Sequence, residues 1–219
     1  MSSDLLPAAT QFFGGRVCLD FANTVDWRTS AAPQELIPDY AALLAWSAAR
    51  HTLAPHTVAG LRTEAQRAAP PAAAALARAH ALRAEIWRMA DRLGQGEPLD
   101  LVPLNRMIAT MPVQPPLLHD GAAYMHDLPG TALDEPLWPI LWSLTAVLAS
   151  QDAARLECCR ATGCGWLFVD ESPNRTRLWC SSELCGNRER ARRAYAKRRK
   201  PLETERRTGP PAAKGREAL

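Results

Sequence analysis

The sequence predicts a mainly α protein: a multihelical N-terminal domain with a small β-ribbon, followed by a cysteine-rich module made of a hairpin and a helix. Apolar residues recur at helical spacing over most of residues 38–156. An Asp-Gly pair separates two apolar runs within residues 111–128, which is typical of a β-hairpin. Five of the six cysteines fall between Cys158 and Cys185. A chain of 219 residues is long enough for one domain and a small module beside it.

The first clear helical signals follow Pro38. Residues 16–25 fit both a strand and a helix, because so short a run does not distinguish the two periods. After Pro38, Asp39 is suited to the first turn of a helix. The apolar stripe that continues this predicted helix consists of Tyr40, Leu43, Leu44 and Trp46.

Further elements complete the N-terminal domain. A helix is expected to begin near Pro55, and a proline pair separates it from a third helix over residues 72–93. A short helix is expected around residues 99–109, and the two-stranded ribbon lies within residues 111–128. A strong i, i+3, i+4, i+7 apolar series predicts a central core helix over residues 134–156.

The composition indicates a folded, soluble protein. Hydrophobic residues make up 47% of the chain and charged residues 22%, which excludes disorder of the whole chain. No apolar run reaches the roughly 20 residues that a membrane span needs, and no basic region precedes an apolar stretch near the start. We therefore expect a cytoplasmic protein without a signal peptide. Residues 201–219 are expected to form a disordered tail.

Charge is distributed unevenly along the chain. Residues 1–157 hold 11 Lys and Arg against 16 Asp and Glu, a net charge of −5, while residues 158–219 hold 15 against 7, a net charge of +8. The basic part points to a polyanionic partner. The sequence therefore divides into an N-terminal domain over residues 1–157 and a module over residues 158–200, followed by the tail.

The clustered cysteines are spaced like the ligands of a metal. Cys159 and Cys164 form one close pair, and Cys180 and Cys185 form a second pair after 15 intervening residues. In a reducing compartment such clusters are more often metal sites than disulfides, and four thiolates are typical of structural zinc. An iron–sulfur cluster and buried free thiols are the alternatives. Cys158 could replace Cys159, although the matched four-residue gap favours Cys159.

These features predict a four-cysteine zinc-binding hairpin-plus-helix module. Gly163 and Gly165 permit the tight turn of a metal knuckle, and the run from Trp166 to Val169 is expected to be a strand. Ser181 or a neighbouring serine can cap the following helix. Because a segment of about 40 residues buries little core, we expect this module to be unfolded without zinc. The isolated cysteine at position 18 is expected to be a core thiol.

A strongly basic helix is predicted over residues 183–200. From Arg188 to Lys200 there are eight Lys or Arg residues and one acid, Glu189. A zinc-anchored helix with arginines on its open faces suits contacts to phosphates and grooves, and a solvated charged helix without a partner is the alternative. The expected phosphate anchors are Arg192, Arg193, Lys197, Arg198, Arg199 and Lys200. The candidates for base or phosphate contact near the helix start are Asn187, Arg188 and Arg190.

Taken as one motif, the module resembles the CGNR zinc-finger family. The motif is Cys159-x4-Cys164-Gly-Trp-Leu-Phe-x-Asp170-x-Ser172-x-Asn174-x-x-Arg177-x-Trp179-Cys180-Ser181-x-x-x-Cys185-Gly186-Asn187-Arg188. The front segment, Gly15-Arg-Val-Cys-Leu-Asp-Phe-Ala-Asn-Thr24, is similar to the helical ABATE domain that precedes this finger. The resemblance implies a stress-induced bacterial transcription regulator that binds DNA through the finger. It also implies one zinc ion on Cys159, Cys164, Cys180 and Cys185.

The chain departs from the family pattern between the two cysteine pairs. Pro173 and Leu178 stand where basic residues are common, and Arg190 replaces a frequent lysine. These departures weaken phosphate contacts from the loop over residues 173–178 but leave the metal site intact.

Polar residues of this loop admit two interpretations. Asp170 and Asn174 satisfy backbone groups around the knuckle, or Asp170 pairs with Arg177. In the alternative interpretation, DNA is contacted directly by Asn174, Arg175 or Arg177.

The front domain leaves a similar choice. Asp20 and Asn23 form an effector pocket, or they cap and bridge the backbone of neighbouring elements. The leading hypothesis is a DNA-binding regulator whose N-terminal domain senses a small-molecule effector or forms a homodimer. The alternative is an RNA- or ribosome-associated zinc protein without sequence specificity. The chain has no nucleophile elbow, phosphate-binding loop, dinucleotide fingerprint or His-Glu metal motif, so we expect no enzyme.

Overall fold

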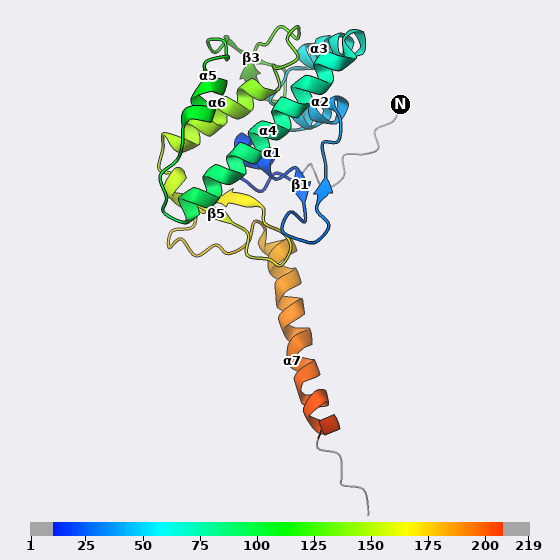
Figure 1. The fold of residues 1–219 in the computed structure, drawn as a ribbon, viewed down its shortest axis with the longest axis vertical. Helices are drawn as coiled ribbons and strands as arrows, with labels where there is room; N and C mark the ends of the chain where they lie inside the picture. Colours follow the sequence, from blue (N-terminus) through cyan, green and yellow to red (C-terminus); the bar gives the residue numbers. More distant parts are fainter. Residues whose placement is uncertain (1–10, 208–219) are drawn as a thin grey trace, which may run out of the picture. The chain divides into compact units, whose positions relative to one another are not determined.

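The computed structural model describes residues 11–207, with side chains described up to residue 198, and it confirms the mainly helical fold (Figure 1). The α-helices in chain order are α1 (Val17–Ala22), α2 (Tyr40–Ala49), α3 (Pro55–Arg67), α4 (Ala69–Gly94), α5 (Val102–Ile108), α6 (Leu137–Leu148) and α7 (Asn187–Arg207). The strands are β1 (Val25–Asp26), β2 (Gln34–Glu35), β3 (Leu117–His119), β4 (Tyr124–His126), β5 (Leu156–Cys158) and β6 (Leu167–Val169), which form the antiparallel pairs β1–β2, β3–β4 and β5–β6.

The chain divides into two compact units. Within the described residues, the first unit covers residues 11–180 and the second covers residues 181–207. Two short turns, η2 (Ala153–Arg155, 3₁₀) and η3 (Ser182–Gly186, π-helical), complete the described elements. No helix in the described part of the chain is long and apolar enough to cross a membrane.

Helices of the first unit begin where the sequence supplies a start signal. The Asp39 carboxylate caps α2 by accepting a hydrogen bond from the Ala42 N–H at 2.7 Å. Prolines occupy the first turns of α3 and α4, where their missing N–H groups cost no helical hydrogen bond. The helices predicted near Pro55 and over residues 72–93 are therefore confirmed, with α4 beginning at Ala69.

The short helix α1 lies at the centre of the core. Residues 16–25, which fitted either period, fold into α1 and the start of β1. Cys18, Leu19 and Phe21 are fully buried, and α1 packs against α4 and α6. Burial raises the pKa of the Cys18 thiol to about 11, so this cysteine is a core thiol as expected. The indole of Trp46 meets the Phe21 ring edge-on at a centroid distance of 5.4 Å.

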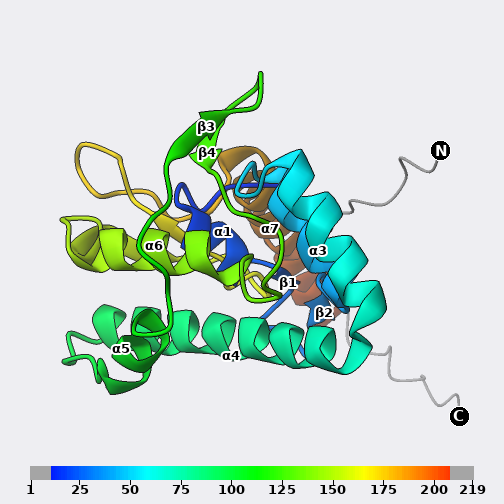
Figure 2. The ribbon, with the colours of Figure 1, turned by 90° about the horizontal axis from the view of Figure 1, so that it is seen from above.

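The predicted β-ribbon is confirmed as β3–β4. Leu117 pairs with His126, and His119 pairs with Tyr124. The Asp120 carboxylate accepts hydrogen bonds from two N–H groups of the turn, both at 2.9 Å. The tip of this ribbon stands away from the helices in Figure 2.

The helix predicted over residues 134–156 is wrong at its C-terminal end. Helix α6 stops at Leu148, because Ser150 ties the chain into a turn. The Ser150 hydroxyl donates to the Val147 carbonyl at 3.0 Å and accepts from the Asp152 N–H at 3.2 Å. After η2 the chain becomes extended and forms β5.

The β5–β6 hairpin belongs to the first unit and shares its core. Strand β6 confirms the expected strand after Trp166, and Cys158 lies opposite Leu167 in the register. Leu167 and Val169 are about 1% exposed and join the main hydrophobic cluster, so the hairpin buries apolar side chains that a short isolated module would expose. This burial removes the reason for expecting residues up to Cys180 to unfold without zinc.

The second unit consists of η3 and α7. Ser181 caps the start, as expected, with its hydroxyl accepting from the Leu184 N–H at 3.2 Å. Helix α7 continues to Arg207, beyond the predicted end at residue 200 and into the range expected to be disordered. The remainder of that predicted tail, residues 208–219, lies outside the described residues.

Candidate metal centre and nucleic-acid surface

The first cysteine pair is held by a knuckle between β5 and β6. The Cys159 N–H donates to the Trp166 carbonyl at 2.8 Å, and the Cys164 N–H donates to the Ala161 carbonyl at 3.0 Å. Gly163 and Gly165 adopt left-handed φ values of 80° and 68°, which the tight turn requires.

Gly165 also allows the knuckle to approach another part of the first unit. A Cβ atom at this position would lie 2.5 Å from the Cγ2 atom of Thr29, in the loop between β1 and β2. The Thr29 N–H donates to the Gly163 carbonyl at 3.3 Å. The knuckle is therefore fitted against an N-terminal loop.

The four predicted ligands are brought together. The sulfur atoms of Cys159, Cys164, Cys180 and Cys185 all lie within 4.8 Å of one another, and the side chains are buried. The Sγ atoms of Cys164 and Cys180 are 3.8 Å apart. A tetrahedral site with zinc–sulfur bonds of about 2.3 Å has sulfur–sulfur edges of about 3.8 Å. Both the donor set and its spacing fit one structural zinc ion.

Cys158 lies outside this cluster. Its side chain is exposed, whereas the thiol of Cys159 is buried among the other ligands. Neighbouring residues of an extended strand point to opposite faces, so only one of two adjacent cysteines can turn inward. The geometry supports Cys159 as the ligand, which resolves the alternative left open by the spacing.

One charged group beside the ligands was not anticipated as part of the metal centre. An Nη atom of Arg188 lies 3.3 Å from the Cys185 Sγ atom within the second unit. An N–H donor at this position stabilises a thiolate and orients a metal ligand. The Cys-Gly-Asn-Arg sequence places Arg188 in the turn after Cys185, and this i, i+3 spacing was the available signal.

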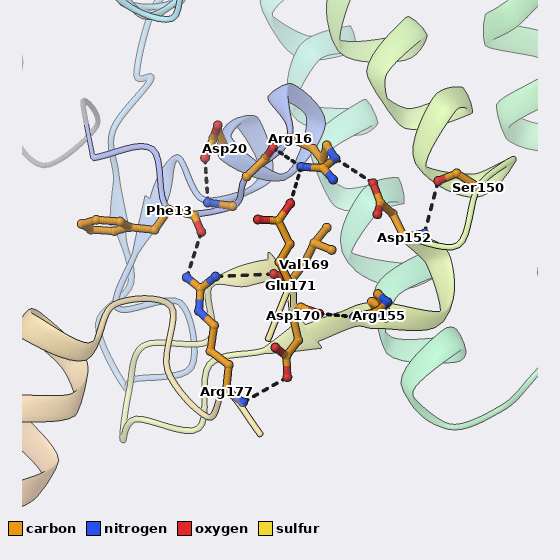
Figure 3. A network of polar contacts seen from close by, with 12 residues as sticks. Phe13, Arg16, Asp20, Ser150, Asp152, Arg155, Val169, Asp170, Glu171 and Arg177 are labelled. Carbon is orange, nitrogen blue, oxygen red and sulfur yellow. Dashed lines mark hydrogen bonds and ion pairs between the residues drawn. The ribbon is translucent and has the colours of Figure 1, made fainter. Parts of the chain in front are cut away.

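Arg177 and Asp170 have structural roles in the first unit. The Arg177 guanidinium donates to the carbonyl oxygens of Trp179 and Cys180. It also donates to the Phe13 carbonyl at 3.3 Å (Figure 3). It also stacks over the Phe168 ring at 4.3 Å from the centroid. These contacts give Arg177 the structural role that the sequence left open, and contact of Arg177 with DNA stays a prediction.

Asp170 organises the loop that precedes the second cysteine pair. Its carboxylate accepts from the Ser172 N–H at 2.8 Å and from the Arg177 N–H at 3.0 Å. Burial alone would raise the pKa of Asp170, but these hydrogen bonds outweigh it and hold the pKa below its ordinary value. Asn174 and Arg175 are exposed, and Arg175 has a left-handed φ of 51°.

Asp20 and Asn23 are buried and engaged by the protein itself. The Asp20 carboxylate accepts from the Gly14 N–H and from Arg50 Nε, both at 2.8 Å. The Asn23 amide donates to the Leu167 carbonyl at 2.8 Å and accepts from the Leu167 N–H at 2.7 Å. These contacts supply the structural role that the sequence left open, and the effector pocket stays a prediction.

The predicted nucleic-acid residues of the second unit divide into two groups. Near the start, Arg190 donates to the Ser182 carbonyl at 3.1 Å and to the Asn187 side-chain oxygen at 2.5 Å. The side chains of Asn187 and Arg190 are exposed. Farther along α7, the exposed basic side chains are Arg192, Arg193, Lys197 and Arg198. The side chains of Arg199 and Lys200 lie outside the described residues.

These features define a class of protein: a helical domain followed by a zinc finger with four cysteine ligands and a basic helix. Comparison with protein families names the family directly. The ABATE family, described as "Putative stress-induced transcription regulator", matches residues 15–151, and the CGNR zinc finger matches residues 155–198. The chain belongs to the ABATE family and carries a CGNR finger, which confirms the resemblance seen in the sequence. A search of curated proteins gave no match.

Proposed function

We propose that this protein is a cytoplasmic transcription regulator that binds DNA through α7, with zinc fixing the start of that helix. The family description supports a regulator, and the exposed basic surface of α7 carries the proposal. No catalytic step is part of it.

The charges on α7 are available to a polyanion. Arg193, Lys197 and Arg198 are exposed and form no ion pair with another described residue. Arg193 and Lys197 stand four residues apart, so they lie on the same side of the helix. Paired positive charges on one helical face attract the phosphates of a nucleic-acid backbone.

The sequence-reading contacts belong near the helix start. Recognition helices place N-terminal residues against base edges, while more distant charges anchor phosphates. Asn187 and Arg190 are exposed there and share a hydrogen bond, which holds both side chains in a defined position before contact. We assign base or phosphate contact to these two residues.

Zinc supplies a structural cross-link and no reaction step, because four thiolate ligands leave no open coordination position. Two hydrogen bonds within the second unit stabilise the start of the helix. Ser181 caps it, and Arg188 donates to the sulfur of the ligand Cys185. The homodimer and the small-molecule effector remain proposals for the N-terminal domain.

The test is selection of fragmented genomic DNA by the zinc-loaded full-length protein at near-physiological salt. The variant is Arg193→Gln/Lys197→Gln, and the matched control is Arg62→Gln/Arg106→Gln, which removes two exposed charges from the first unit. We expect the wild type and the control to enrich a few intergenic sites, and the α7 variant to lose affinity at all of them. Each lost phosphate contact should reduce the slope of log affinity against log salt by about 1.

Other outcomes separate the alternatives. Retention of all fragments without enrichment, together with equal binding of RNA, would support the non-specific nucleic-acid protein instead. Equal loss in the α7 variant and in the control would contradict a binding surface on α7.

A further inference from the structure

The outer edge of β6 is covered by the N-terminal segment. On one side β6 pairs with β5, and on the other its edge faces residues 13–23. The Asn23 side chain bonds both the N–H and the carbonyl of Leu167, as a partner strand would. The Val169 N–H, also on this edge, donates to the Gly14 carbonyl at 3.2 Å. An edge that would otherwise leave backbone groups unpaired is thereby closed.

The covered strand is the one that positions the first ligand pair. Cys164 lies three residues before Leu167, and Cys159 hydrogen-bonds the Trp166 carbonyl directly beside it. A shift of Leu167 along or away from the Asn23 amide would move both cysteines, because the knuckle is too short to absorb it. The Asn23 amide thus contacts the strand that holds the first ligand pair.

The third ligand is tied to the same N-terminal segment. The Arg177 guanidinium donates to the Phe13 carbonyl (Figure 3) and also to the Cys180 carbonyl. Its contact with the Phe168 ring holds it against β6. Arg16 adds ion pairs to Asp152 at 2.7 Å and to Glu171 at 3.0 Å on either side of the hairpin. Cys159, Cys164 and Cys180 are therefore held by contacts that start in residues 13–23.

We propose that Asn23 is a positioning residue for the zinc site, acting through Leu167, and that zinc affinity depends on this N-terminal clamp as well as on the cysteines. The clamp is defined as Phe13, Gly14, Asn23 and their partners Leu167, Val169 and Arg177. The inference rests on the zinc site and is independent of DNA binding, so either proposal can fail alone.

The physical basis is preorganisation. Ligands that are already fixed near their bound positions lose less conformational freedom when the metal binds. Removing groups that orient metal ligands from outside the first coordination sphere typically lowers metal affinity by about 10- to 100-fold. Since Asn23 acts through one strand, we expect a loss near the lower end, about tenfold.

The experiment measures zinc dissociation constants of full-length variants by competition with a chromophoric chelator under reducing conditions. Asn23→Leu keeps a similar volume and removes both hydrogen bonds to Leu167. Thr57→Val is the matched control, because Thr57 is buried and donates to the Leu128 carbonyl at 2.6 Å, at a site without cysteine ligands. Arg177→Lys tests the second arm of the clamp if Asn23→Leu does not fold. The cobalt-substituted spectrum of each variant reports the geometry of the thiolate ligands.

We expect weaker zinc binding and an altered cobalt–thiolate spectrum in Asn23→Leu and Arg177→Lys, with wild-type values for Thr57→Val. Urea unfolding of each variant checks that it is folded under the assay conditions. A general loss of stability is then distinguished from a specific loss of zinc affinity. Wild-type zinc affinity and spectrum in the clamp variants would overturn the proposal. The proposal would also be overturned if Thr57→Val weakened zinc binding as much as the clamp variants do.

Discussion

Two adjacent cysteines have different environments in this protein. The Cys159 side chain points into a cluster of four buried thiols, whereas Cys158 is exposed at the end of β5. The pKa of the Cys158 thiol is raised, chiefly by partial burial of the sulfur, and its side chain lies outside the ligand cluster. Because neighbouring residues of an extended strand point to opposite faces, Cys159 can be a ligand while Cys158 cannot.

Substituting the two cysteines separately tests this difference. Cys158→Ser should retain one zinc ion per chain, since its thiol lies outside the cluster. Cys159→Ser should lose stoichiometric zinc, because three thiolates with a hydroxyl form a much weaker site. Zinc content after dialysis, measured by atomic emission, gives the answer. Loss of zinc in Cys158→Ser with retention in Cys159→Ser would reverse the ligand assignment.

A second residue pair makes a pH-dependent contribution to stability. Arg83 on α4 forms a bidentate ion pair with Glu35 on β2, in which Arg83 Nη1 lies 2.8 Å from Glu35 Oε1. Burial on its own would raise the pKa of Glu35, but the Arg83 and Ile37 hydrogen bonds outweigh it and hold the pKa below 4.5. The folded-state pKa is therefore lower than the unfolded one. The resulting stabilisation is present above the unfolded value and is lost as pH falls through the folded value.

Glu35→Gln should therefore destabilise the protein at pH 7 by about 1 kcal/mol, a modest value because the carboxylate is partly exposed to solvent. The difference from wild type should shrink as the pH falls below 4.5. Urea unfolding at a series of pH values measures it, with Glu97→Gln as a control for an exposed ion pair. A difference that stays constant down to pH 3 would contradict the assignment.

At the scale of elements, the hairpin β5–β6 is the part for which the structure most changes the expected stability without zinc. Its inner face contributes Leu167 and Val169 to the main core, and its outer edge is paired with the N-terminal clamp. Classical small zinc modules have neither source of stability and unfold without metal. Here zinc adds to an element that is already packed.

Zinc removal should consequently leave the first unit folded. A chelator is expected to lower its unfolding midpoint in urea while the transition stays cooperative, because the apolar core does not involve the metal. Near-ultraviolet circular dichroism and tryptophan fluorescence report the packing of the tryptophan side chains, among which Trp46 and Trp166 are buried in the first unit. Cys180→Ser should behave like the zinc-free wild type. Loss of the cooperative transition on chelation would show that the hairpin depends on zinc after all.

Local signals in the sequence were sufficient for several elements. The Asp39 cap, Pro55 and the Asp-Gly turn each act within a few residues, so α2, α3 and the β3–β4 ribbon were predictable. The cysteine spacing also predicted the ligand cluster, because each pair is close in sequence. The early end of α6 was missed, since the apolar series runs on while the Ser150 turn stops the helix.

The clamp was not predictable from local pattern. Asn23 and Leu167 are 144 residues apart, and neither periodicity nor spacing links positions at that distance. The sequence did single out Asp20 and Asn23 as polar residues in an apolar run, which correctly marked a buried polar contact. It could not distinguish a ligand pocket from a backbone partner, because both require the same residue types.

At the scale of the whole molecule, family boundaries and packing boundaries differ. The ABATE match ends at residue 151 and the finger match begins at residue 155, whereas the first compact unit extends to Cys180. The basic charge is concentrated after residue 157, with a net charge of +8 against −5 before it. The region of the finger match therefore includes both a hairpin built into the acidic unit and the basic helix α7.

The edge closure by Asn23 limits how the finger can be joined to other proteins. A finger cut at residue 155 and grafted onto a foreign protein would carry β6 with its outer hydrogen-bonding groups open beside the apolar side chains of Leu167 and Phe168. Such an edge recruits other strands and favours aggregation. To keep this edge closed, a chimera that carries the finger of this protein would also have to include residues 13–30.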